Sequence, residues 1–245
     1  MSNSFINTNV SLCSPRPSSG LDPNAPLLIY SSSPYHGSDD MPLNHVLIKI
    51  DKFGFSVNNV TYQALGEHPH FQYLDFHHTP SSADGKCLSK THSLIPVWGF
   101  GIILKLTHPK IQAGKRIYGY LVPTRYLLLP ISPNDVNKVA FYIPRSHLPA
   151  GPYVLISNTI QSNPALCLSD PQYTPTSTAE DLTMLYRPLF WTSYWCEDWL
   201  NSSNYHGGAH TILISSASSK TAFCLVYIIA KQRQNVEGKK SNAAL

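Results

Sequence analysis

The chain has 245 residues, of which 42% are hydrophobic and 13% charged, and its formal net charge is +4. This length and apolar share allow one large domain or two ordinary ones with a buried core. The charge is spread along the chain and gives no sign of nucleic-acid binding. The longest apolar run, residues 222–230, is too short to cross a bilayer, and no signal peptide is visible. The five dispersed cysteines suit a reducing compartment. We expect a globular, cytoplasmic protein without nucleic-acid or membrane partners.

The first part of the chain is predicted to be rich in β-structure. Residues 1–25 contain mostly Ser, Asn and Pro, which predict a disordered tail. From residue 45 to residue 51 the apolar residues alternate as in a half-buried strand, and Gly54 ends the pattern. Short β-branched and aromatic stretches, punctuated by Gly and Pro, continue over residues 95–131 and are typical of a barrel or sandwich. We expect one β-rich domain over residues 26–178.

The end of this domain, residues 143–178, is predicted to be an irregular connection because its repeated prolines exclude long helices. A helix is expected next, capped by Ser177 or Thr178, with acidic residues in its first turn. Pro188 should end or kink this helix. Residues 179–245 therefore form a third segment, with a linking helix, a polar loop at 201–208 and then a strand, a turn and a second helix.

That last part reads "TILISSASSKTAFCLVY", residues 211–227. A strand that turns into a helix presents free N–H groups and the positive end of the helix dipole, a combination that favours anions. A lysine at the start of a helix is disfavoured by the dipole unless an anion lies beside it, which points to a ligand near Lys220. The hydroxyl groups that can donate to phosphate oxygens belong to Ser215, Ser216, Ser218, Ser219 and Thr221.

Two phosphate-binding templates compete for this turn. The Walker loop would require Ile214 as a glycine equivalent, and the loop would then be too short. The dinucleotide fingerprint G-x-G-x-x-G/A fits the strand, turn and helix lengths. Its glycines would be replaced by Ser216, Ser218 and either Thr221 or Ala222. A serine-capped helix with an exposed lysine is the structural alternative.

Three longer stretches, residues 45–67, 95–129 and 187–222, resemble a known superfamily of enzymes. In order, they resemble the opening strand and loop of the GroES-like catalytic domain, its barrel segment, and the linking helix with the first Rossmann turn. These are parts of the zinc-free quinone-oxidoreductase branch of the medium-chain dehydrogenase/reductase superfamily. A closer resemblance is to the DUF2855-type family, carried by "NNVTYQ" (58–63), "PVWGF" (96–100), "GKRIYGYLVP" (114–123), "RPLFWTSYWCEDWL" (187–200) and "SSASSKTA" (215–222).

The resemblance implies an α/β class, α+β when the whole chain is counted. It comprises a GroES-like β-rich domain, a linking helix and the first β-α unit of a Rossmann domain that is truncated near Leu245. It further implies an NAD(P)H-dependent oxidoreductase that transfers hydride to an enone, quinone or carbonyl acceptor. The serine turn, residues 215–221, would cradle the pyrophosphate of NADPH. The extra positive charge favours NADPH over NADH.

Hydride transfer needs a donor for the developing oxyanion, and Asn58, Asn59 and Tyr62 are the candidates at the position where relatives line the cleft. Alternatively, the two asparagines cap a loop and Tyr62 packs in the barrel. No zinc site is expected, because "NNVTY" offers no thiolate or imidazole and the histidines around residues 68–78 suit a polar surface.

A rival hypothesis from another class is that the chain is a catalytically inactive remnant that acts as a binding partner. A half Rossmann sheet would leave an edge strand available for pairing with another chain. A P-loop hydrolase is disfavoured because no Walker-B strand follows the turn. The sequence leaves a homodimer open and does not identify the small-molecule substrate.

Overall fold

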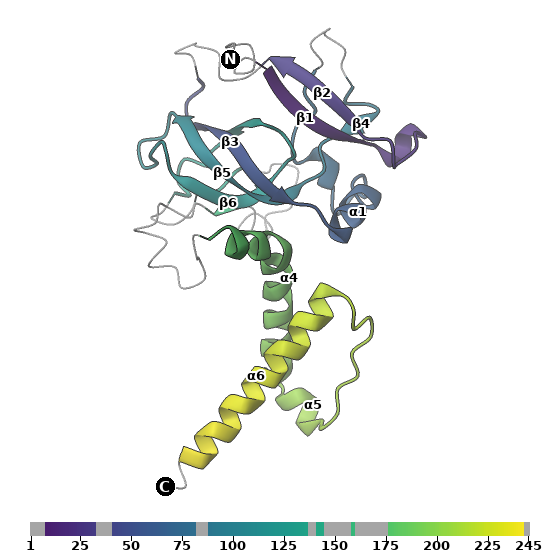
Figure 1. Cartoon of the computed structure of the whole chain (residues 1–245), viewed down its shortest axis with the longest axis vertical. Coiled ribbons are helices and arrows are strands. Elements are labelled where there is room, and N and C mark those ends of the chain that lie inside the picture. Colours follow the sequence, from purple (N-terminus) through teal and green to yellow (C-terminus); the bar gives the residue numbers. More distant parts are fainter. Residues whose placement is uncertain are drawn as a thin grey trace. The chain divides into compact units, whose positions relative to one another are not determined.

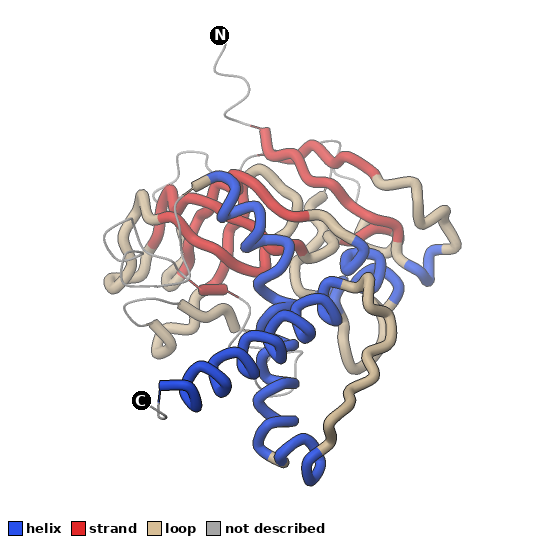
Figure 2. Tube along the Cα trace, turned by 60° about the horizontal axis from the view of Figure 1, so that its bottom comes forward, coloured by secondary structure: helices blue, strands red, loops and turns tan. Residues whose placement is uncertain are grey.

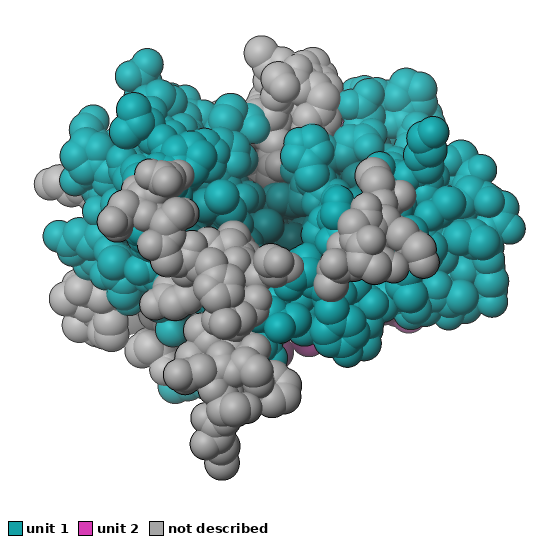
Figure 3. Space-filling model, turned by 90° about the horizontal axis from the view of Figure 1, so that it is seen from above, with its two compact units in different colours: residues 1–181 teal, residues 182–245 magenta. Residues whose placement is uncertain are grey.

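The computed structural model of the chain describes residues 8–32, 41–81, 88–136, 141–144, 158–159 and 176–242. Two compact units divide the chain, unit 1 with residues 1–181 and unit 2 with residues 182–245, coloured teal and magenta in Figure 3. The described part of unit 1 is built mainly of antiparallel strands, whereas the described part of unit 2 is helical. The fold class is therefore mixed α+β, with antiparallel sheets.

The described part of unit 1 contains two sheets (Figure 1). The larger, ordered β7-β3-β5-β6-β8, consists of β3 (His45–Gly54), β5 (Val97–Leu106), β6 (Arg116–Leu121), β7 (Tyr126–Pro130) and β8 (Asn158–Thr159). The smaller, ordered β2-β1-β4, consists of β1 (Thr8–Pro15), β2 (Leu27–Ser32) and β4 (His92–Ser93).

Helices complete the described structure. Unit 1 has α1 (Val57–Ala64) and the 3₁₀ turns η2 (Pro17–Ser19) and η3 (Tyr73–Asp75); α4 (Ser177–Ser202) begins in unit 1 and continues into unit 2; unit 2 adds α5 (Asn204–Gly208) and α6 (Lys220–Asn242). Among these described helices, none has the length and apolar content that a bilayer crossing requires.

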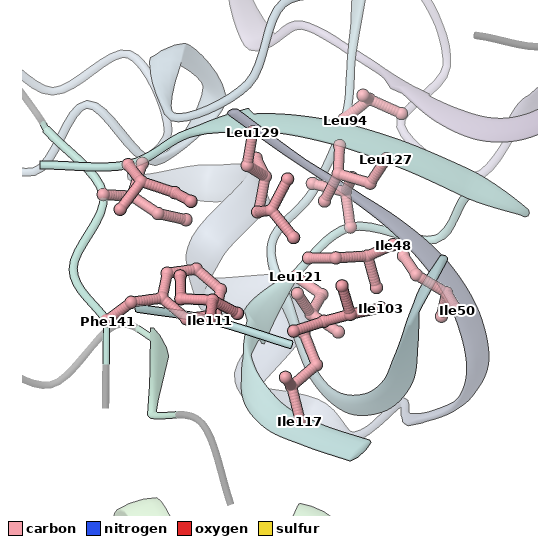
Figure 4. Close-up of a cluster of buried hydrophobic side chains, with 14 of the residues drawn as sticks. Ile48, Ile50, Leu94, Ile103, Ile111, Ile117, Leu121, Leu127, Leu129 and Phe141 are labelled. Carbon is pink, nitrogen blue, oxygen red and sulfur yellow. The ribbon is translucent and has the colours of Figure 1, made fainter. Parts of the chain in front are cut away.

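The strands predicted at residues 45–51 and within residues 95–131 are confirmed as β3, β5, β6 and β7. Alternate side chains of these strands meet in one buried aliphatic cluster (Figure 4). Its members include Val46, Ile48, Ile50, Ile103, Ile117, Leu121, Leu127 and Leu129. Burying each such side chain contributes roughly 1.5–3 kcal/mol, so the cluster accounts for the arrangement of the larger sheet.

Glycine permits a close approach between β3 and β5. A Cβ atom on Gly101 would lie 2.6 Å from Cγ2 of Ile48, and one on Gly99 would lie 2.7 Å from the carbonyl oxygen of Lys52. The pairing of β3 with β5 also shifts register twice, after Leu47 and after Ile50. Because any side chain at these positions would clash with β3, the close crossing requires glycine.

The predicted tail over residues 1–25 is wrong for residues 8–15, which form β1 between β2 and β4. Two of its buried residues, Asn9 and Ser11, are polar, whereas Cys13 packs in the apolar core. Both polar groups of the Asn9 side chain bond to the backbone of Tyr126, and the Ser11 hydroxyl lies 2.8 Å from that of Thr124. Hydrogen bonds satisfy these buried polar groups, so the strand tolerates them. With polar residues at buried positions, the sequence of β1 lacks the hydrophobic pattern of a strand. Burial also raises the pKa of the Cys13 thiol to about 12.

The predicted helix after residue 178 is confirmed as α4, but its cap and its length differ from the prediction. Thr176, rather than Ser177 or Thr178, caps it, because its hydroxyl accepts the N–H of Ala179 and its carbonyl that of Glu180. The helix also continues through Pro188. The irregular connection predicted over 143–178 lies largely outside the described residues.

The strand predicted over 211–214 does not form. These residues have no strand partner among the described residues, and Figure 2 shows the segment between α5 and α6 as a loop. A β-strand exists only through pairing with a neighbour, so apolar residues alone do not create one. Leu213 is 97% exposed as a result.

A charged cluster joins the first turn of α4 to the larger sheet within unit 1. The Nε and Nη2 atoms of Arg116 donate to the two carboxylate oxygens of Glu180 at 2.6 and 2.8 Å, and Nη2 also donates to Asp51 at 2.6 Å. Lys52 Nζ lies 3.0 Å from Glu180 and 3.1 Å from Asp181. The hydrogen bonds to Glu180 raise the pKa of Arg116 against the opposing effect of burial. Such a bidentate pair fixes both orientation and position.

We predict that Glu180→Gln lowers the free energy of unfolding by about 2 kcal/mol, because it removes the negative charge between two partly buried cations. Urea unfolding of the purified chain measures this. Asp181→Asn is the matched control, since the Asp181 side chain is 54% exposed and its pair should contribute less than about 0.5 kcal/mol. Equal losses in the two variants would contradict the prediction.

A second ionic contact joins the segment after β1 to the segment after α1. Glu67 accepts hydrogen bonds from the hydroxyl and the backbone N–H of Ser18, both at 2.8 Å, and from Arg16 at 3.4 Å. Burial acts to raise the pKa of Glu67, but the Ser18 and Arg16 contacts outweigh it and hold the pKa below its ordinary value. The folded state therefore favours the ionised carboxylate.

A carboxyl group whose pKa is depressed by folding stabilises the protein above its unfolded-state pKa, and this contribution disappears as the pH falls through the folded-state pKa. We predict that the free energy of unfolding falls more steeply below about pH 4.3 in the wild type than in Glu67→Gln, by roughly 1 kcal/mol in total. Urea unfolding between pH 6 and pH 3 measures both slopes. Identical slopes would show that Glu67 is not stabilised in this way.

Candidate functional site

The stretch predicted to follow the first strand as a loop is instead the helix α1, so the loop prediction is wrong. Ser56 precedes the helix, and the Asn59 side-chain oxygen accepts the N–H of Ser56 at 2.8 Å. The Asn59 amide group donates to the carbonyl of Pro96 at 2.9 Å, and the residue is buried. This capping arrangement satisfies backbone groups at the start of the helix. Asn59 therefore holds α1 against the start of β5, since its amide oxygen and its amide nitrogen each bond to a backbone group.

The other two candidate donors also lie on α1. Asn58 is partly buried, and within the described structure its side chain makes no hydrogen bond. The Tyr62 ring contacts Tyr73 and Tyr120, with centroids 4.8 and 5.7 Å away. Tyr62 thus packs in an aromatic cluster beside the larger sheet, as the structural alternative expected. Asn58 is the candidate with an uncommitted side chain.

The serine turn lies wholly in unit 2 and begins α6. The Ser219 hydroxyl accepts the N–H of Ala222 at 3.2 Å, and the Ser219 carbonyl accepts that of Phe223 at 2.9 Å, so Ser219 is the cap of the helix. Ser216 has φ 52°, and its carbonyl accepts the N–H of Ser219 at 2.8 Å. A non-glycine residue in this left-handed region is strained, by about 1–3 kcal/mol. The backbone therefore makes the tight turn that a glycine usually makes.

Other polar side chains of the serine turn make no hydrogen bond or ion pair within the described residues. The hydroxyls of Ser215, Ser216 and Ser218 are on exposed residues and make no hydrogen bond there. Lys220, the first residue of α6, forms no ion pair with a described acid. Hydroxyl donors, a cation and the helix N-terminus are thus grouped on consecutive residues, and this set fits the diphosphate of a dinucleotide.

A strained turn at residues 204–208, within the predicted polar loop, precedes this segment. Five consecutive residues have positive φ, namely Asn204, Tyr205, His206, Gly207 and Gly208. The Tyr205 hydroxyl donates to the buried carboxylate of Glu197 at 2.6 Å, and the His206 ring lies 5.3 Å from that of Trp199. The signal was present in "NYHGG", because Asn and Gly adopt the left-handed region most readily.

Within the described residues no three His, Cys, Asp or Glu side chains are grouped in a way that could hold a metal ion. His68 and His70 are exposed, and each ring contacts Phe71. These contacts are those of a polar surface next to the aromatic cluster.

These features define a mixed α+β protein in which a strained serine turn begins a long helix with most of its apolar residues in its first half. The chain belongs to the family described as "Protein of unknown function (DUF2855)", whose sequence profile matches residues 53–243. No curated protein matches the chain at a significant level. Among solved structures, the chain is similar to a mutant form of enoyl thioester reductase from Candida tropicalis, with a TM-score of 0.45 and 12% sequence identity. The match covers 89% of this chain and 50% of that enzyme, so the chain spans about half its length.

We predict that Asn59→Ala lowers the free energy of unfolding by about 1–3 kcal/mol, because the N–H of Ser56 and the carbonyl of Pro96 both lose their partner. Asn58→Ala, one residue earlier on the same helix, should change it by less than about 0.5 kcal/mol. Thermal and urea unfolding of the two variants measure this difference. If Asn59→Ala has the same free energy of unfolding as the wild type, Asn59 does not have this structural role.

Proposed function

We propose that the chain is an NAD(P)H-dependent oxidoreductase-like protein of the medium-chain reductase type. In this proposal it transfers hydride to an enone, quinone or carbonyl acceptor and uses no zinc. The three longer stretches, residues 45–67, 95–129 and 187–222, support the proposal, because they resemble consecutive parts of that type of reductase in chain order.

The single observation that carries the proposal is the backbone of Ser216. The residue has φ 52° at the position where the dinucleotide fingerprint has its first glycine. In that fingerprint the first glycine makes the tight turn before the helix, and the pyrophosphate lies at the helix N-terminus. In this chain residues 211–214 pair with no described strand, so the comparison rests on the turn and the start of α6. A strained residue that keeps this conformation without being glycine is expected where the turn itself has a use.

In this proposal the serine turn holds the diphosphate. Ser215, Ser216 and Ser218 donate hydroxyl hydrogen bonds, and the start of α6 supplies the N–H groups of Lys220 and Thr221 and the charge of Lys220. The Ser219 N–H already bonds to the Ser216 carbonyl, so Ser219 would contribute through its hydroxyl proton. The bound dinucleotide would supply the hydride. The net charge of +4 favours NADPH over NADH in this proposal.

On the substrate side, the α1 residues Asn58 and Tyr62 remain the proposed donors to the oxygen of a small-molecule acceptor. A donor aimed at a developing oxyanion acts by stabilising charge in the transition state. Asn59 is left out because both of its amide atoms already bond to the backbone.

A second candidate function rests on a different observation. Residues 211–214 are extended and apolar, and no described strand pairs with them. Unpaired backbone groups of this kind can add to the sheet of another chain. A chain that acts as a binding partner without catalysis would use this segment and would not require the serine turn.

We predict that NADPH binds the 245-residue chain saturably in a calorimetric titration and that Lys220→Ala weakens the affinity by about tenfold or more. The reason is the loss of a charge-assisted contact to a phosphate, which contributes about 1.5–3 kcal/mol. Lys231→Ala is the matched control, because it removes the same charge from α6 at a residue that lies against the ring of Tyr227. An NADH titration under the same conditions tests the choice of cofactor.

Two results would contradict this function. A folded wild-type chain that does not bind NADPH would favour the binding-partner alternative. Equal weakening by Lys220→Ala and Lys231→Ala would show that general electrostatic attraction, rather than the serine turn, holds the dinucleotide.

A further inference from the structure

The side chain of Ser193 connects two helices at the base of the serine turn. Ser193 lies on α4, is 0% exposed, and its hydroxyl oxygen is 2.8 Å from the carbonyl oxygen of Thr221 on α6. The same hydroxyl lies 2.9 Å from the carbonyl of Leu189, one turn earlier on α4. All three residues belong to unit 2. Thr221 follows Lys220, so this contact reaches the first turn of α6.

The contact with Thr221 differs in kind from the contact with Leu189. A serine hydroxyl on a helix commonly bonds to the carbonyl four residues earlier, and such a bond stays within its own helix. The bond to Thr221 joins residues 28 positions apart and links α4 to α6. A hydroxyl has one proton, so the two carbonyl oxygens share it. A buried side chain this small also lets the two helix backbones approach each other.

The neighbouring Thr192 provides an internal comparison. Its hydroxyl donates to the carbonyl of Pro188 at 3.1 Å, again four residues earlier, but the residue is exposed and makes no contact of this kind with α6. Two adjacent hydroxyls on one helix thus have the same local bond, and only that of Ser193 also reaches the helix that carries the serine turn.

We infer that Ser193 is a positioning residue for the serine turn. By holding the Thr221 carbonyl, it fixes the first turn of α6, from which the side chain of Lys220 and the N–H groups of Lys220 and Thr221 extend. This role rests on the proposed function, because the ligand that the turn would receive is the diphosphate of NADPH. Ser193 itself contacts no part of the ligand and acts through the backbone of Thr221.

The test combines two readouts on Ser193→Ala, with Thr192→Ala as the control. Hydrogen exchange reports the amides of Ala222 and Phe223, which bond to Ser219 at the start of α6. We expect exchange at these amides to be at least tenfold faster in Ser193→Ala, with α4 unchanged. Calorimetry should show NADPH binding weakened at least fivefold, and Thr192→Ala should stay within twofold of the wild type in both measurements.

A double variant separates positioning from a general structural role. If Ser193 acts through the turn, the loss of NADPH affinity in Ser193→Ala combined with Lys220→Ala should be smaller than the product of the two single losses. Amide hydrogen exchange that is faster along the whole of α4 and α6 would overturn the inference. A loss of NADPH affinity in the double variant equal to the product of the two single losses would also overturn it. Ser193→Cys, which keeps the size but weakens the donor, repeats both readouts if Ser193→Ala does not fold.

The two proposals fail in different ways. If the folded wild type does not bind NADPH, the proposed function fails, and exchange at Ala222 and Phe223 alone decides whether Ser193 positions the turn. If the wild type binds NADPH but Ser193→Ala has wild-type exchange and affinity, the inference about Ser193 is wrong and the proposed function stands.

Discussion

The ionic contact between Arg116 and Glu180 is the interaction on which the rest of the arrangement in unit 1 depends. One guanidinium bonds to two carboxylates, those of Glu180 and Asp51, and it also lies over the ring of Phe100 at 5.2 Å. Glu180 stands in the first turn of α4, where a negative charge is also favoured by the helix dipole. The contact therefore ties the first turn of α4 to β6 of the larger sheet.

The parts of the fold that were predictable from sequence are those whose buried residues are apolar. β3 has alternating apolar residues, and β5, β6 and β7 are short β-branched and aromatic stretches bounded by Gly and Pro; both patterns are direct signals of strands. β1 has the same geometry, but Asn9 and Ser11 occupy its buried positions, so its pattern is that of a polar tail. The segment 211–214 shows the opposite case, because its residues suit a strand but no described segment pairs with it.

The candidate site was predictable to a similar degree, and for related reasons. The serine turn was visible because hydroxyl residues and a lysine at a helix start are a local pattern. The role of Asn59 was not visible, because its partner Pro96 lies 37 positions away and only the folded chain brings them together. The same holds for Ser193 and Thr221, and for Arg116 and Glu180. Local chemistry can be read from neighbouring residues, whereas these pairs depend on tertiary packing.

The turn at residues 204–208 has a consequence for the handedness of the chain. A run of left-handed residues is the mirror image of an ordinary helical turn, so the preference between L- and D-amino acids is reversed there. In a chemically synthesised chain, D-asparagine at position 204 or D-histidine at position 206 would match the backbone that the L-residues adopt only under strain. Replacing an L-residue by its D-form within α4 or α6 would break a right-handed helix. Mirror-image residues would thus favour the native backbone at this turn and disrupt the helices around it.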